Sequence, residues 1–420
     1  MSTDTILTRV AEETANAVVQ LNDVTESIGS KIESISNKAK DSINYVNQHH
    51  ATKLTEIKNV ASDSYRQSIE DMSGGKNTVV YDAQGNVNIM VRIPRFNYED
   101  INEAIFDKYG VDLKLGTGTP TMFMRNGEPL GEVLIAKYLA SSGQNGGCSV
   151  VGGKQPLTSI SYDSAKNMCA NKGTGWHMLS AHEWAAIALW SLANDTIPRG
   201  NTNYGRSHER KLETARRDDN AMPGDASGSA RTDTGKGPVG WTHDHTEWGI
   251  HDLVGNVWEW LDQLCLVDGQ IISTLDNNPD IAESSWFKHS AFFDSPSNIT
   301  DGAEGAGSPV LSDKVTNRNG PMGDDTHSNP YLGNPDYSSI SKAASYVPNE
   351  ALRRLLIESE TQNVLSGALY CRNYGNRFPL RGGDWSNGNI AGLGAISFNY
   401  SRTGTFSGFG FRPALLPAQN

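Results

Sequence analysis

Residues 5–72 contain no proline and carry apolar side chains at steps of three and four, which is the repeat of one face of an α-helix. The other faces are rich in Glu, Lys, Asp, Ser and Asn. At 1.5 Å of rise per residue, this helix would extend on the order of 100 Å. The apolar stripe consists of Ile28, Ile32, Ile35, Ala39, Ile43, Val46, His50, Leu54, Ile57 and Val60.

A lone helix would leave this stripe in water, so a partner has to cover it. We therefore predict that residues 1–73 form a coiled-coil stalk, in which parallel copies of the chain cover one another. A homotrimer is the preferred state. Helices that fold back on themselves as a hairpin are the alternative.

The end of the helix is marked by Ser73-Gly74-Gly75, because glycine readily ends a helix. Two β-rich runs follow and flank Ala83-Gln84-Gly85-Asn86, which is typical of a hairpin, and Pro94 closes the second run. Residues 74–97 are therefore expected to form a short β-rich collar between the stalk and a head at residues 98–420.

Within the head, Ser161 and Ser180 each precede a helical pattern, and Glu183 completes a capping box with Ser180. A further helix is expected at residues 350–365. Two long polar stretches, at about 200–240 and 268–346, are interpreted as surface insertions. The fold class is α+β, with much irregular structure in the head.

Charge and cysteine usage exclude several classes of protein. The net charge of −12 and a pI of about 5.3 argue against a general nucleic-acid binder. No apolar run approaches the roughly 18 residues of a membrane span, so no membrane insertion and a soluble product of the cytoplasm are expected. Cys148, Cys169, Cys265 and Cys371 lack metal-site spacing and are expected to be buried thiols, with one disulfide possible.

The C-terminal stretch opens with Arg-Gly-Gly-x-Trp at Arg381 and closes with Gly-Phe-Arg at Arg412. From Gly382 to Ala418 it contains no Lys, Glu, Gln or Met, and it is rich in Ser, Gly, Asn and aromatic residues, as recognition loops are. Many of its side chains are those reached when the adenines of an AAC or AAT codon are randomised. This composition favours a variable binding face, although a Gly/Ser/Asn-rich surface loop would look similar.

Three segments in order resemble the formylglycine-generating-enzyme type of C-type lectin fold. They are GTGWHMLSAHEWAAIA after a Tyr-x-x-Ala helix, then GIHDLVGNVWEW, and finally RGGDW ending in GFR. In an extended segment, Trp258 and Trp260 point to one side and Glu259 to the other. Arg381 and Arg412 are expected to bind Glu259 or nearby backbone carbonyls and to act as scaffold.

The enzymes of this family that oxidise peptide cysteines carry cysteines soon after their Arg-Gly-Gly-Ser-Trp motif, whereas here no cysteine follows Cys371. The iron-dependent sulfoxide synthases need a three-histidine site on an added helical domain, which has no counterpart here. We therefore expect no enzyme activity and no cofactor. A metal site at His243, Asp244, His245, His251 and Asp252 is a weaker alternative, because His-x-His spacing places both rings on one face of a strand.

The non-enzymatic branch, the variable proteins of diversity-generating retroelements, resembles this chain over RGGDWSNGNIAGLGAISFNYSRTGTFSGFGFRPAL. It includes tropism determinants of phages. The resemblance implies a tail-fibre adhesin on the virion, made in the host cytoplasm. Its variable segment at 382–412 would bind a protein or glycan receptor on the bacterial surface, while the stalk would join tail or baseplate proteins.

The alternatives are a cysteine-peptide oxidase and a non-viral display protein with the same variable face. The candidate ligand contacts are Ser386, Asn389, Ile390, Ser397, Asn399, Tyr400, Thr403, Thr405, Phe406 and Ser407. Tyr400 and Phe406 are the expected hot spots, because aromatic side chains dominate binding energetics. Asp-rich loops such as 218–219 and 324–325 would permit calcium binding.

Overall fold

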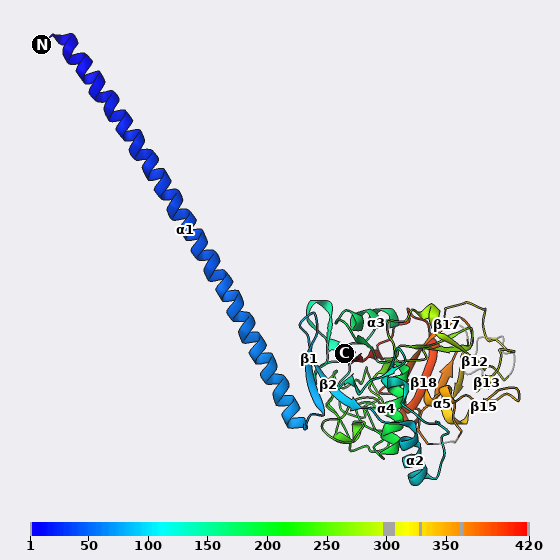
Figure 1. The fold of residues 1–420 in the computed structure, drawn as a ribbon. Coiled ribbons are helices and arrows are strands. Elements are labelled where there is room, and N and C mark those ends of the chain that lie inside the picture. The colour runs from blue at the N-terminus through cyan, green and yellow to red at the C-terminus, as the bar shows by residue number, and fades with distance from the viewer. Residues whose placement is uncertain (1, 297–306, 327–329, 361–363, 418–420) are drawn as a thin grey trace. The chain divides into compact units, whose positions relative to one another are not determined.

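The computed structural model describes residues 2–296, 307–326, 330–360 and 364–417. The chain is an α+β protein that divides into two compact units, Met1–Gln67 and Ser68–Asn420. We call the second unit the head, and it begins before the predicted boundary at residue 98. Figure 1 shows the elements of both units. No helix among the described residues is long and apolar enough to cross a membrane.

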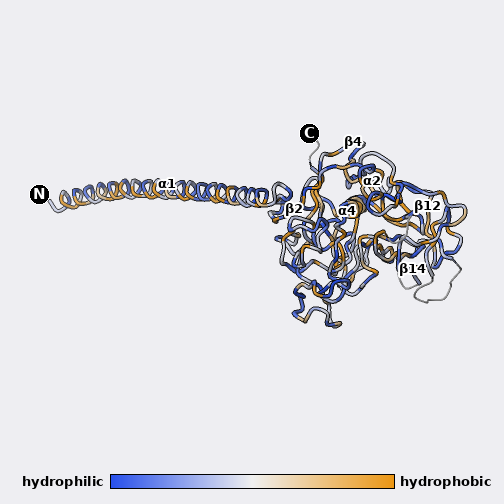
Figure 2. The backbone as a smooth tube through the Cα atoms, turned by 90° about the horizontal axis from the view of Figure 1, so that it is seen from below, coloured by the Kyte–Doolittle hydropathy of each residue, from blue (hydrophilic) through white to orange (hydrophobic). Residues whose placement is uncertain are grey.

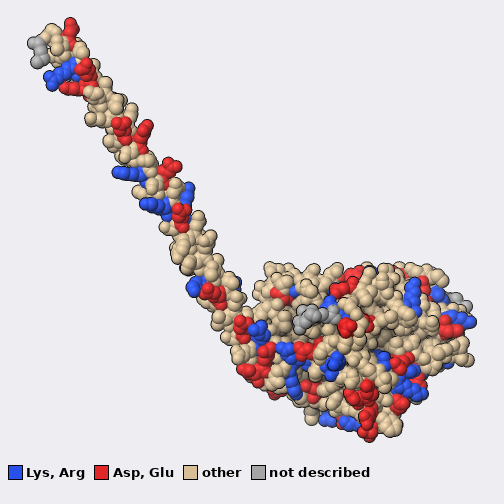
Figure 3. All heavy atoms as spheres, viewed as in Figure 1, with Lys and Arg blue, Asp and Glu red and all other residues tan. Residues whose placement is uncertain are grey.

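The N-terminal helix α1 spans Thr3–Ser73 without interruption, which confirms the predicted helix and excludes the hairpin. Apolar residues recur along it (Figure 2), and charges of both signs lie between them (Figure 3). The stripe is exposed in the single chain, with Ile35 and Val60 each 67% accessible. The helix ends where predicted, since Gly74 and Gly75 adopt left-handed backbone angles with φ of 61° and 81°.

A five-stranded sheet carries the N-terminal hairpin of the head, in the order β1-β2-β5-β20-β8. The β-hairpin of β1 and β2 confirms the turn predicted at residues 83–86, and its second strand ends at Pro94. The collar at 74–97 is not a separate element, however, because Met90–Pro94 of β2 pair with β5 of the head. The strands are β1 (Asn77–Tyr81), β2 (Val87–Pro94), β5 (Glu132–Ala136), β8 (Trp176–Met178) and β20 (Pro413–Leu415).

An eleven-stranded sheet forms the other half of the head's framework, along the path β14-β16-β18-β17-β10-β11-β12-β13-β15 with β9 and β19 beside it. The predicted insertion at 268–346 supplies five of these strands, so it is part of the sheet and not a decoration. Phe293 and Leu311 from this stretch lie in the main core because their strands pair with the sheet.

The strands of this sheet are β9 (Trp258–Trp260), β10 (Leu264–Val267), β11 (Gln270–Ser273), β12 (Phe287–Asp294), β13 (Val310–Ser312), β14 (Leu332–Asn334), β15 (Ser341–Lys342), β16 (Leu369–Cys371), β17 (Asn376–Gly382), β18 (Gly392–Tyr400) and β19 (Phe409–Phe411). Two small ribbons pair β3 (Met124–Arg125) with β4 (Glu128–Pro129) and β6 (Ser141–Ser142) with β7 (Cys148–Ser149).

Helix α4 (Ala181–Ala193) is buried along nearly its whole length and belongs to the main core. Its predicted capping box is present, since Ser180 and Glu183 each accept a hydrogen bond from the other's backbone N–H. The indole of Trp184 donates to the carbonyl of Leu393, which ties α4 to β18. The other helices are α2 (Tyr98–Tyr109), α3 (Tyr162–Ala170) and α5 (Glu350–Arg354).

The helix predicted over 350–365 is shorter than expected, because α5 ends at Arg354. Leu356 adopts a positive φ of 54°, and the carbonyls of Leu355 and Leu356 accept hydrogen bonds from Arg381. The chain thus turns where its leucines enter the core. Residues 361–363 lie outside the described residues. The 3₁₀ turns are η1 (Thr121–Phe123), η2 (Gln144–Gly146), η3 (Val239–Trp241), η4 (Glu283–Ser285), η5 (Tyr337–Ser339) and η6 (Gly388–Ile390).

The segment at 200–240 is irregular, as predicted, but it is not merely a surface loop. Arg217 is fully buried and donates to the carbonyl of Asp225 and to the carboxylate of Asp219. Thr232 and Thr234 are buried as well. All four cysteines are buried free thiols, which confirms that prediction.

Candidate ligand-binding site

A buried ion pair holds the end of the C-terminal segment in place. Arg412 donates to both carboxylate oxygens of Glu259, with Nε–Oε2 and Nη2–Oε1 distances of 3.0 and 2.8 Å. It also donates to the carbonyls of Ala136 and His251. Both side chains of the pair are 0% accessible, so the predicted partnership of Arg412 with Glu259 is confirmed.

The start of the segment is held by carbonyl groups. Arg381 is fully buried and donates to the carbonyls of Leu355, Leu356 and Gly394, at 2.7, 3.3 and 3.3 Å. The next position requires glycine. Gly382 has a φ of 93°, and a Cβ there would lie 2.5 Å from the Leu253 carbonyl oxygen. Arg381 and Arg412 therefore bind this irregular segment to the rest of the head at both ends.

Between these anchors lies an open cavity of about 320 Å³. Its base is set by strand register, because Ser397 of β18 lies opposite both Tyr370 of β16 and Leu380 of β17. One wall is likewise set by register, where Phe409 of β19 pairs with Trp258 of β9. The lining residues are Trp258, Tyr331, Tyr370, Leu380, Asp384, Asn387, Ser397, Asn399, Tyr400, Phe406 and Phe409.

Aromatic rings make up much of this lining and contact one another edge to face. Phe409 is in contact with Tyr400 and Phe406, at ring-centroid distances of 4.7 and 5.5 Å. Tyr331 meets Tyr370 at 5.7 Å. Such pairs hold the rings in defined orientations. The cavity is therefore a shaped, aromatic recess.

Of the described residues that line the cavity, Asp384 alone has a formal charge at neutral pH. Its Oδ1 accepts hydrogen bonds from the backbone N–H and the hydroxyl of Ser386, at 2.9 and 2.8 Å. Burial raises the pKa of Asp384, although the bonds from Ser386 oppose this. Its Oδ2 accepts no hydrogen bond from a described residue and has no partner cation among them.

The predicted ligand contacts divide into two groups. Ser397, Asn399, Tyr400 and Phe406 line the cavity together. Tyr400 is half-buried and Phe406 is 51% accessible, so both reach solvent. The other predicted contacts do not line it. Among these, the exposed ones are Ser386, Asn389, Thr403 and Thr405, and the half-buried ones are Ile390 and Ser407.

Sequence reasoning missed several lining residues. Trp258 is not among the predicted contacts, yet it lines the cavity, and so do Asp384 and Asn387 of the RGGDWSN motif. Their position beside Arg381 was a usable signal. Tyr331 and Tyr370 come from distant strands that only the pairing of β14, β16 and β18 brings to the site.

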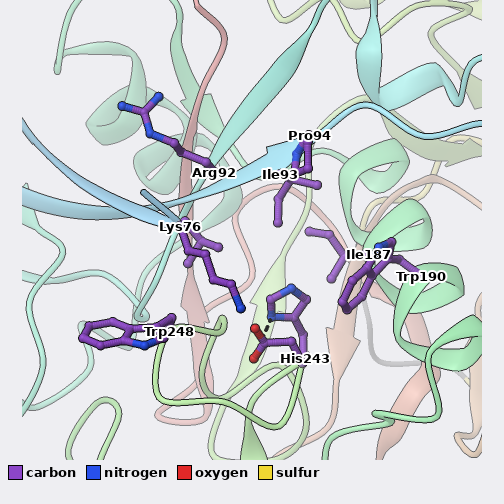
Figure 4. A pocket seen from close by; sticks show the side chains of 10 residues that line it. Lys76, Arg92, Ile93, Pro94, Ile187, Trp190, His243 and Trp248 are labelled. Carbon is purple, nitrogen blue, oxygen red and sulfur yellow. Dashed lines mark ion pairs between the residues drawn. The ribbon is translucent and has the colours of Figure 1, made fainter. Parts of the chain in front are cut away.

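A second cavity, of about 200 Å³, lies beside β2 and α4 (Figure 4). Its walls are mostly apolar and include Trp190 and Trp248, and Lys76 and His243 point into it. His243 Nδ1 accepts a hydrogen bond from the Ile250 N–H, so the neutral ring carries its proton on Nε2. Burial lowers the pKa of His243 to about 4.

This cavity contains part of the alternative metal site. His245 Nε2 lies 3.1 Å from the carbonyl oxygen of Ile197, and Asp244 accepts hydrogen bonds from Thr246, so these groups are engaged within the protein. Within the described residues, no group of three or more His, Cys, Asp or Glu side chains is arranged to hold a metal ion. His243 and His245 each contact a backbone group, the N–H of Ile250 and the carbonyl of Ile197.

Residues 135–308 match the family model described as the sulfatase-modifying factor enzyme 1-like domain. This range holds the first two motifs of the resemblance, GTGWHMLSAHEWAAIA and GIHDLVGNVWEW, and ends before RGGDW. No curated protein matches the chain.

Several solved structures share a distant likeness, each with a TM-score of 0.30. The Major Tropism Determinant P3c variant is 11% identical, over 81% of this chain and 71% of that one. PvdO from Pseudomonas aeruginosa is 14% identical, over 80% and 97%. Treponema denticola variable protein 1 is 12% identical, over 81% and 99%. TM-scores of this size do not establish a common fold, so these likenesses carry no argument about function.

Proposed function

We propose that this chain is a receptor-binding protein of a phage tail fibre, and that its C-terminal face binds a receptor on the bacterial surface. The observation that carries the proposal is the aromatic cavity in which Ser397, Asn399, Tyr400 and Phe406 meet. All four are among the ten ligand contacts predicted from the sequence. Their convergence on one open recess is what a binding face requires.

The construction of the segment supports this proposal. Its two ends are fixed by fully buried arginines, and the residues between them supply the cavity wall and the exposed positions around it. Substitutions at those positions would change ligand contacts and leave the anchors intact. The match of the chain to the RGG…GFR frame of retroelement-diversified proteins agrees with this division.

Helix α1 supports a multivalent protein. Its apolar stripe is exposed along the helix, and parallel copies would bury it as a coiled coil. We propose a homotrimer, in which several weak sites on one stalk increase avidity by orders of magnitude. Multi-angle light scattering of the full chain at micromolar concentration tests this, and a monomer would contradict it.

Cysteine oxidation is the competing function, and the thiols do not favour it. A reactive cysteine needs an accessible thiolate. Here burial raises the pKa of Cys148 to about 11 and that of Cys265 to about 12, and it also raises the pKa values of Cys169 and Cys371. None of the four lines the aromatic cavity. Binding is therefore the better-supported function.

Adsorption tests the proposed function. Full-length protein with both Tyr400→Ala and Phe406→Ala should lose binding to host cells, because the two rings form one wall of the cavity. Thr403→Ala, a change at an exposed position outside the lining, is the control. Undiminished adsorption by the double variant, with its near-ultraviolet circular dichroism unchanged, would refute the proposal.

A further inference from the structure

The aromatic cavity contains the carboxylate of Asp384, whose charge no described residue neutralises. Asp384 is largely buried, its Oδ1 is used by Ser386, and its Oδ2 has no hydrogen-bond or ion-pair partner among the described residues. A ligand that covers the cavity would remove the remaining water from this carboxylate. Burying an unpaired charge is costly, so a ligand that brings neither a cation nor a hydrogen-bond donor to Oδ2 would bind against a penalty.

A cation would remove that penalty and gain from the walls. Trp258, Tyr331, Tyr370, Tyr400 and Phe406 all line the cavity, and aromatic faces attract ammonium and guanidinium groups. Lysine and arginine also bring several N–H donors, which match a carboxylate acceptor. A cavity of about 320 Å³ has room for one such side chain.

The protein's own Arg372 restricts where this cation can lie. Its Nη1 donates to the carbonyl of Asn399, and its guanidinium lies 6.0 Å from the centre of the Tyr331 ring. A ligand cation would be repelled from this side of the cavity. The favourable position is therefore at Asp384, between the RGGDW loop and the wall formed by Phe406 and Phe409.

From this arrangement we infer that the cavity binds a lysine or arginine side chain of a protein receptor, with Asp384 pairing its charge and the aromatic rings enclosing its stem. The inference rests on the proposed function and specifies its ligand. It selects a protein loop over a neutral glycan, because the glycan offers no charge to Asp384.

Small probes test the inference on the full-length chain. Nα-acetyl-lysine methylamide supplies the cation, Nα-acetyl-norleucine methylamide is its uncharged analogue, and methyl β-glucoside represents a neutral sugar. We expect saturation-transfer NMR to show binding of the lysine probe alone, with an affinity that falls as salt rises.

Asp384→Asn should weaken binding of the lysine probe roughly tenfold or more, because it removes the paired charge. The asparagine can still accept both hydrogen bonds from Ser386, so the turn is kept. Asp336→Asn is a matched control, since Asp336 accepts the same pair of hydrogen bonds from Ser338 and does not line the cavity. It should leave the affinity unchanged.

Each other outcome overturns the inference. Equal binding of the norleucine probe would show a purely apolar site, binding of the glucoside alone would show a glycan site, and failure of all three would show that no cation is held. An Asp384→Asn variant with full affinity would do the same. The proposed function is judged separately: if Tyr400→Ala with Phe406→Ala abolishes cell adsorption while the lysine probe fails, only the cation inference falls.

Discussion

The C-terminal segment contains two sets of residues with opposite environments. The frame, Arg381, Trp385, Phe411 and Arg412, is buried and bound to several other parts of the head. The face, which comprises Ser386, Asn389, Tyr400, Thr403, Thr405 and Phe406, is exposed or half-buried. Within one short segment, folding and binding therefore depend on different residues. The frame positions stabilise the head, and the face positions are available to contact a ligand.

The largest effect is expected at the frame. Arg412→Ala should reduce the free energy of unfolding of the head by about 3–5 kcal/mol, because it leaves Glu259 as an uncompensated buried charge. Arg402→Ala in the same segment is the control. Arg402 pairs with Glu283 near the surface, so its loss should cost no more than about 1 kcal/mol.

Tryptophan fluorescence during denaturant unfolding measures this difference, since all nine tryptophans lie between residues 176 and 385 and report only the head. Equal losses for the two arginine variants would remove the distinction between frame and surface.

Acid should also destabilise the folded head through buried histidines outside the C-terminal segment. Burial lowers the pKa of His182, His243 and His289 to about 4 and that of His251 to about 3, against an ordinary value of 6.5. These rings stay neutral in the folded head, whereas the unfolded chain takes up protons below pH 6.5. Their stabilisation is thus complete above pH 6.5 and is lost as the pH falls towards 4.

By pH 5 the loss is on the order of 2 kcal/mol for each histidine. His177 works in the opposite direction: burial lowers its pKa, but Glu183 outweighs this and raises it. Fluorescence-monitored unfolding at pH 7, 6 and 5 measures the sum. His289→Gln should flatten the dependence, and stability that does not change between pH 7 and 5 would contradict the assignment of neutral buried rings.

An intermediate effect is expected from the aromatic wall. Tyr400→Ala with Phe406→Ala should cost about 1–2 kcal/mol of stability, since both rings are partly in water. Phe411→Ala is the matched frame variant, and it should cost about 3–5 kcal/mol because Phe411 is fully buried. Only the first variant should lose receptor binding at a temperature where both are folded. If the double variant lost as much stability as Phe411→Ala, Tyr400 and Phe406 would belong to the frame and not to the face.

The smallest effect is expected at the exposed positions. Thr403→Ala and Thr405→Ala should each change the free energy of unfolding by less than about 0.5 kcal/mol, because neither side chain is buried. Differential scanning calorimetry measures this directly. A larger change at either position would show that the face also contributes to folding and would weaken the comparison.

Local patterns predicted the local structures well. The uninterrupted repeat before Ser73 gave rise to one helix, the glycines at 74 and 75 ended it, and Ser180 with Glu183 formed the expected cap. The prediction of a helix over 350–365 was too long. The chain turns at Leu355 and Leu356, whose carbonyls accept hydrogen bonds from the distant Arg381. The predictions of a separate collar and of a surface insertion at 268–346 were wrong for a similar reason. Strands in both segments pair with strands far away in the chain, and such pairing cannot be read from local sequence.

The sequence by itself determined the long helix, the α+β character and the buried thiols, because periodicity, caps and composition are local properties. It left open whether Arg381 or Arg412 binds Glu259, and the fold brings Arg412 to that carboxylate. Only the tertiary structure decided which residues share a cavity. Trp258, Tyr331, Tyr370 and Asp384 come from separate strands and loops, and the pairing that joins them depends on contacts between residues far apart in the chain.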